Sequence, residues 1–217
     1  MTTAARRATM LTAVCAAALL TGCTRHVDNP QARPAALAAP ITEIQVVDLL
    51  SPKVLGEDGN LFVVADPERC AGLAREVDPP LIEAGGPLAT DGGHWITEDG
   101  QFYIEEMVAV YRSDFDAAAA VQSARRLVDE CSGERLSVTT MRDRVYDFTV
   151  QPAAGDGPDG SALWGLRAAD WNCDNLFVAA HNAAVEITTC GTSPGYDVAS
   201  LAEDALERIN RLANTTA

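Results

Sequence analysis

Cys23 has the most clearly defined chemistry in this chain, because it ends the sequence Leu20-Thr21-Gly22-Cys23. Two arginines and then an apolar stretch, Ala8–Leu20, come before it, and that stretch is short for a membrane span. Small residues before a cysteine are typical of a bacterial lipoprotein signal peptide; an ordinary secretory signal with an incidental cysteine is the alternative. We therefore expect residues 1–22 to be a signal peptide. Cys23 would then carry acyl chains that hold the protein at the extracytoplasmic face of the cell membrane.

Four further cysteines lie in the part of the chain that would remain after cleavage. An even number of cysteines in an oxidising compartment predicts disulfides, here two, formed by Cys70, Cys131, Cys173 and Cys190. No pair has the C-x-x-C spacing of a zinc site, and the chain has only three histidines. We therefore expect no metal site and no cofactor.

The pairing of the cysteines follows from a predicted hairpin. Two apolar segments, 176–180 and 183–189, flank His181-Asn182, which is typical of a two-residue turn. In that register Cys173 lies directly opposite Cys190, so these residues are expected to form one disulfide. Cys70 and Cys131 are left to form the other.

Candidate ligand-binding residues come from the same register, which separates a wholly apolar face of the hairpin from a mixed face. A sheet with one apolar face is typical of helices packed on that face only, so the mixed face is expected to be open. The strand expected within 101–112 also has an aromatic and acidic side. Such side chains on an open face could contact a ligand; packing beneath a loop is the alternative. The candidates are Tyr103, Glu105, Tyr111, Phe177 and Glu186.

Catalytic motifs are missing from the sequence, which contains no G-x-S-x-G, no H-E-x-x-H and no phosphate loop. The acidic turn 156–160 lacks the alternating acids of an EF-hand and is expected to be a solvated turn. We therefore name no catalytic residue. The formal charge of −15 would repel nucleic acid, which is not an expected partner.

The elements that must position these residues are predicted to form one domain, 41–217, after a lipidated and proline-containing tether, 23–40. Helical patterns lie near residue 41, after Asp66-Pro67, before Gly133 and at the C-terminus. Strands are expected within 94–112, at about 135–141, 144–151 and 161–168, and in the hairpin 176–189, without a βαβ rhythm. This order predicts an α+β fold with a largely antiparallel sheet, helices packed on one face and two stabilising disulfides.

Five short motifs resemble the extracellular sensor domain of the PknH-type mycobacterial receptor Ser/Thr kinases, which also occurs in free-standing lipoproteins. They are Leu49-Leu50-Ser51-Pro52, Cys70-Ala71-Gly72, Cys131-Ser132-Gly133, Trp171-Asn172-Cys173 and Cys190-Gly191. The resemblance covers about residues 45–214 and implies an α+β fold with a cleft on the sheet, the same two disulfides and ligand sensing or binding. It implies no particular ligand, and this sequence shows neither the kinase domain nor the membrane span of those receptors.

Together these patterns predict a lipid-anchored, extracytoplasmic ligand-binding or sensor-like domain of the cell envelope without catalytic activity. The expected partners are the membrane, through Cys23, and an unidentified small molecule, lipid, glycan or protein of the envelope. Two alternatives stay open, namely an envelope hydrolase with an unrecognised active site and an assembly partner of another envelope protein.

Overall fold

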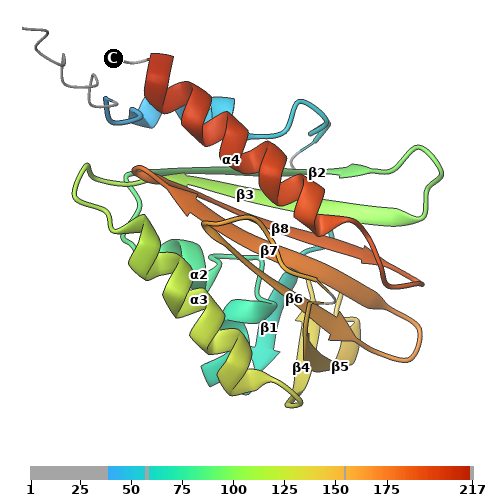
Figure 1. Cartoon of the computed structure of the whole chain (residues 1–217). Coiled ribbons are helices and arrows are strands. Elements are labelled where there is room, and N and C mark those ends of the chain that lie inside the picture. The colour runs from blue at the N-terminus through green and yellow to red at the C-terminus, as the bar shows by residue number, and fades with distance from the viewer. Residues whose placement is uncertain (1–38, 57–58, 154, 216–217) are drawn as a thin grey trace, which may run out of the picture. The chain divides into compact units, whose positions relative to one another are not determined.

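The computed structural model describes residues 39–56, 59–153 and 155–215, so the expected signal peptide and Cys23 lie outside the described residues. Its eight strands form a single curled sheet in the order β1-β4-β5-β6-β7-β8-β3-β2, with every neighbouring pair antiparallel (Figure 1). The strands are β1 (Phe62–Asp66), β2 (Ala89–Ile96), β3 (Phe102–Val110), β4 (Arg135–Thr140), β5 (Val145–Pro152), β6 (Ser161–Arg167), β7 (Asn172–Ala180) and β8 (Ala183–Gly191). The helices are η1 (Glu43–Leu49), η2 (Glu68–Leu73), α2 (Pro80–Glu83), α3 (Ala117–Cys131) and α4 (Val198–Thr215).

The two long helices cover opposite faces of the sheet, which corrects the expectation of helices on one face (Figure 1). Leu176 and Val185 belong to an apolar cluster with α4 and η1, on the face that the hairpin pattern predicted to be covered. On the other face, Phe177 packs with residues of α3. That face also carries large apolar side chains of β5 and β6, such as Phe148 and Trp164, which require a cover of their own.

The predicted hairpin register is confirmed, since Cys173 pairs with Cys190 and Phe177 pairs with Glu186 across β7 and β8. Both disulfides also form as expected. Cys173 and Cys190 are joined at an S–S distance of 2.02 Å, and Cys70 is joined to Cys131 at 2.07 Å. The Cys70–Cys131 disulfide links η2 to the end of α3 and so holds η2 in place.

The N-terminal part of the domain departs most from the predicted elements. The helix expected after Asp66-Pro67 is a 3-10 helix, η2, and Asp66 ends a strand, β1, that the sequence did not predict. α3 begins after Asp116, whose Oδ1 accepts a hydrogen bond from the backbone N–H of Ala119 at 2.9 Å. Within the described ranges, none of the helices combines the length and the apolarity that a membrane span requires.

Two buried polar residues tie distant segments to the sheet. Arg208 of α4 pairs with Glu106 of β3, and its Nε donates to the carbonyl oxygen of Leu49 at 2.8 Å. Asn182, in the β7–β8 turn, exchanges two hydrogen bonds with the backbone of Ile41, each 2.9 Å long, and donates to the carbonyl oxygen of Tyr111. These contacts hold η1 and α4 on one face and leave part of the other face open.

Candidate ligand-binding cleft

The open part of the sheet face opposite α4 is hollowed into a cleft of two adjoining cavities. The inner cavity measures about 310 Å³ and the outer cavity about 370 Å³, and both are lined by Glu76, Glu105 and Thr188. The outer cavity is lined by Thr140 of β4 and also by Thr188 of β8, although three strands separate β4 from β8 in the sheet. Curling of the sheet therefore creates the cleft, whose size suits a small molecule.

Four glutamates line the inner cavity, and three of them, Glu76, Glu105 and Glu186, come from different elements and have no cationic partner among the described ion pairs. Glu105 lies on β3, Glu186 lies on β8, and Glu76 follows η2. Glu76 accepts a hydrogen bond from the backbone N–H of Phe62 at 2.8 Å. Glu186 is only 6% exposed, and its Oε2 has no hydrogen-bond partner among the described residues. The inner cavity thus concentrates acidic groups, one of which is buried and incompletely satisfied.

Burial raises the pKa of each of these three glutamates, because a carboxylate loses hydration away from water. The pKa of Glu76 rises to about 7, against the opposing effect of hydrogen bonds from Phe62 and Thr188. Burial and then the charge of Glu76 raise the pKa of Glu105 to about 8, and the same two causes raise the pKa of Glu186 well above its ordinary value. The inner cavity therefore holds exchangeable protons near neutral pH.

Aromatic side chains line the outer cavity. Trp171 lies between Tyr103 and Tyr146, with ring centroids 5.9 Å from the first and 6.1 Å from the second. The guanidinium of Arg144 lies 4.5 Å from the ring centroid of Tyr146, and the same side chain pairs with Asp170 at 3.2 Å. Tyr103 is 48% exposed, so part of this aromatic wall is open to a ligand ring or apolar chain.

The cleft brings together three of the five residues predicted to bind a ligand, Tyr103, Glu105 and Glu186. The other two lie in the core, which corrects their assignment to an open face. Tyr111 is 1% exposed, stacks on Phe115 and donates a hydrogen bond from its hydroxyl to the carbonyl oxygen of Ile82 at 2.9 Å. Phe177 is also 1% exposed, because α3 covers the part of the sheet face on which it lies.

Several residues of the cleft were not among the predicted candidates. Thr188 could have been found from the hairpin register, since it follows Glu186 by two residues and shares its face. Trp171 stands in a recognised motif but just before β7, outside any predicted strand. Glu76 lies in an irregular segment after η2, where no periodicity assigns a side chain to a face.

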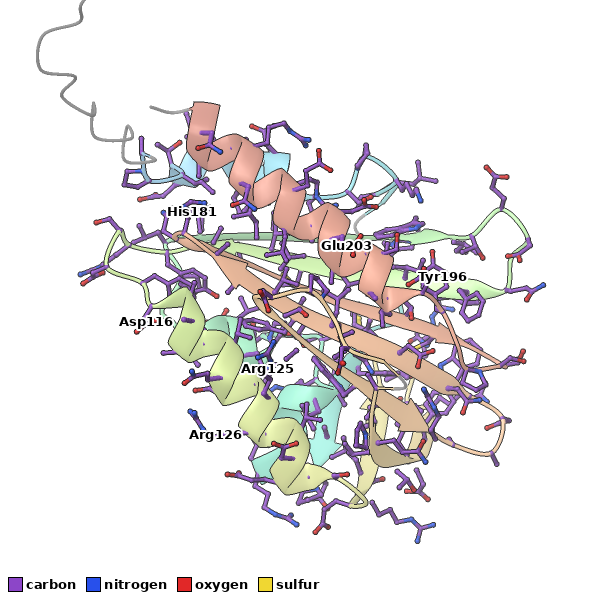
Figure 2. All side chains as sticks on the ribbon, viewed as in Figure 1. Asp116, Arg125, Arg126, His181, Tyr196 and Glu203 are labelled. Carbon is purple, nitrogen blue, oxygen red and sulfur yellow. A yellow bond between two sulfur atoms is a disulfide. The ribbon has the colours of Figure 1, made fainter. Side chains whose placement is uncertain are left out.

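The donor groups of the cleft do not form a metal site. Among residues 39–56, 59–153 and 155–215, no group of three or more His, Cys, Asp or Glu side chains is arranged to hold a metal ion. His181 is placed at the β7–β8 turn, where its Nε2 lies 3.0 Å from Oδ1 of Asn210 on α4 (Figure 2). The arrangement instead suits recognition of an organic molecule, with hydrogen-bonding acids at one end and aromatic rings at the other.

Comparison with known proteins gives the same family that the sequence motifs indicated. A family model described as "PknH-like extracellular domain" matches residues 52–208. The serine/threonine-protein kinase PknH of Mycobacterium bovis is 22% identical over 158 residues, which cover 71% of this chain and 26% of the kinase. The putative lipoprotein LprH of Mycobacterium tuberculosis is 27% identical over 150 residues, which cover 64% of this chain and 62% of LprH.

The fold is also similar to a solved structure. The crystal structure of the extracellular domain of PknH from Mycobacterium tuberculosis aligns with a TM-score of 0.63 at 18% identity, covering 80% of this chain and 99% of that domain. The chain therefore spans about a quarter of the length of the kinase relatives and shares the fold of their extracellular domain. Because the family model covers most of its length, the chain belongs to the PknH-like extracellular domain family.

Proposed function

We propose that this protein is a lipid-anchored, extracytoplasmic ligand-binding domain of the cell envelope, and that it binds a small molecule in the cleft without transforming it. The family description as an extracellular domain and the similarity to a putative lipoprotein support an envelope location. The lipoprotein-type sequence Leu20-Thr21-Gly22-Cys23 supports attachment through acyl chains on Cys23. The relatives include a serine/threonine-protein kinase, PknH, that has an extracellular domain, which supports a sensor-like role.

The cleft itself is the observation on which the proposal depends. Its two cavities combine an aromatic wall at Tyr103 and Trp171 with buried hydrogen-bonding groups at Glu186 and Glu76. A concave site with apolar rings and a few convergent polar groups is the usual form of a small-molecule site. On the opposite sheet face, α4 and η1 pack against apolar side chains of β7 and β8.

Native mass spectrometry of the purified protein, after incubation with an envelope extract, tests this proposal. We expect an adduct of defined mass that is lost in the double variant Tyr103→Ala/Trp171→Ala, because the aromatic wall would be removed. Ile44→Ala is a suitable control, since Ile44 is exposed on η1, on the opposite face of the sheet. An adduct that persists in the double variant would place binding elsewhere on the protein.

A hydrolase is the second candidate, because three carboxyl groups with raised pKa values, Glu76, Glu105 and Glu186, line one cleft. A protonated carboxylic acid beside a carboxylate is the arrangement that glycosidases use. Turnover of an envelope glycan by the wild type, lost in both Glu105→Gln and Glu76→Gln, would favour this candidate over binding alone. Recovery of the bound molecule unchanged after prolonged incubation would favour the binding function.

A further inference from the structure

The buried acidic residues of this domain differ in whether a cationic side chain pairs with them. Glu106 faces α4 and pairs with Arg208, and Asp174 pairs with Arg167. Glu186 is also buried and, like Glu106, lines the inner cavity, but its Oε2 has no partner among the described residues. Buried carboxylates normally have a paired charge or a full set of hydrogen bonds. The positive charge missing at Glu186 would therefore come from outside the chain.

The other residues around the inner cavity do not supply that charge either. Among the described residues that line it there is no arginine, lysine or histidine, whereas four of them besides Glu186 are acidic: Glu76, Asp91, Glu105 and Glu106. Glu105 has the charge of Glu76 nearby, which disfavours ionisation of both groups. The described lining of the inner cavity is therefore acidic and includes no cationic side chain.

We propose that the inner cavity binds its ligand through a protonated amine or a guanidinium group, which pairs with Glu186, Glu105 and Glu76. This inference rests on the proposed function, since it names the ligand class of the same cleft. A metal ion is a poorer occupant, because the acidic groups do not converge as a metal-binding set in the described part of the chain. An organic cation has several N–H donors pointing in different directions, so it can reach carboxylates on separate strands.

The outer cavity supplies the rest of the recognition surface. Tyr103 and Trp171 line the outer cavity together with Glu76 and Glu105. A ring or apolar chain attached to the cation would therefore contact these two aromatic side chains. Arg142 and Arg144 line the outer cavity but are not among the lining residues of the inner cavity, so their charge favours a cation in the inner cavity over the outer one. The ligand class is therefore a molecule with a cationic end and an aromatic or apolar body.

Binding of such a cation releases protons. The carboxylic acids of the inner cavity are partly protonated near neutral pH, and a cation stabilises their carboxylate forms, so the displaced protons pass to the buffer. The charged and titratable groups around the pocket come from several elements. They are Glu76 after η2, Asp91 and His94 on β2, Tyr103, Glu105 and Glu106 on β3, Tyr111 after β3, Arg142 and Arg144 between β4 and β5, Tyr146 on β5, Glu186 on β8, and Arg208 of α4, which pairs with Glu106. The acids dominate this set, so affinity for the cation falls as pH falls.

Three probes with one ring and different end groups test the inference on the full-length protein in detergent. Tyramine has an ammonium group, tyrosol a neutral hydroxyl and 4-hydroxyphenylacetate a carboxylate. By calorimetric titration at pH 8 we expect tyramine to bind at least about tenfold more tightly than tyrosol, with the carboxylate weakest. That preference should shrink at pH 5, and the heat of tyramine binding should differ between buffers of different ionisation enthalpy.

A matched pair of variants assigns the preference to the pocket. In Glu186→Gln the tyramine preference should fall about tenfold, whereas tyrosol binding should be retained and so report an intact cleft. Glu203→Gln, at an exposed position on α4, should behave as the wild type (Figure 2).

Tyrosol or 4-hydroxyphenylacetate binding as tightly as tyramine would overturn the cationic ligand class and leave the binding function standing. Failure of all three probes to bind would also overturn it, while the adduct from envelope extract would separately decide whether the cleft binds anything.

Discussion

Replacement of Glu76 by glutamine should make the protein more stable, and by an amount that grows with pH. The pKa of this carboxyl rises from 4.5 to about 7 in the folded protein. The folded state therefore binds more protons than the unfolded state between these values, so stability falls as pH rises through this range. With these two pKa values, Glu76 alone lowers the free energy of unfolding by about 2.5 kcal/mol between pH 5 and pH 8. Glutamine removes this loss and can still accept the hydrogen bond from Phe62.

Urea unfolding with the disulfides intact, followed at pH 5 and at pH 8, measures the effect. The difference in unfolding free energy between Glu76→Gln and the wild type should be larger at pH 8 by about 2.5 kcal/mol. Glu203→Gln, on the exposed side of α4, should follow the wild type at both pH values. A Glu76→Gln difference that is the same at both pH values, within about 0.5 kcal/mol, would refute the raised pKa and with it the acidic character of the inner cavity.

Three further predictions concern the packing around the cleft. Arg208→Met should cost about 3–5 kcal/mol in chemical denaturation because Glu106 is left as an unpaired buried charge, and Glu106→Gln in the same background should recover much of that loss. Asn182→Ala should cost about 1–3 kcal/mol and expose the Ile41 amide to hydrogen exchange; unchanged exchange there would contradict the hydrogen bonds between Ile41 and Asn182. Tyr111→Ala should cost about 3–5 kcal/mol, whereas Tyr103→Ala should cost under about 1 kcal/mol; equal losses would contradict their opposite placement.

The sequence was sufficient to predict the features that depend on local periodicity. The turn at His181-Asn182 sets the register of β7 and β8, and this register correctly paired Cys173 with Cys190 and placed Glu186 beside the open part of the sheet. Alternation along β3 likewise placed Tyr103 and Glu105 on one face. Three of the five candidate residues therefore lie at the cleft, and their role in binding stays a prediction.

Features that depend on the curvature of the sheet could not be predicted from local patterns. Alternation says which face Phe177 and Tyr111 share with Glu186, but it does not say where along that face α3 and α2 end. Those two side chains therefore lie beneath helices, while Glu186 lies in the open cleft. Glu76 enters the cleft from a segment without regular structure, and only the three-dimensional path of the chain brings it there.

The hydrogen bonds between Ile41 and Asn182 also determine where the described chain enters the domain. They fix the entry of the described chain at the turn end of β7 and β8, whereas Cys190, which lines the outer cavity, lies eight residues after Asn182. At the rise of an extended strand this separates the two points by about 27 Å. The point at which the described chain enters the domain and the aromatic end of the cleft therefore lie at opposite ends of β8.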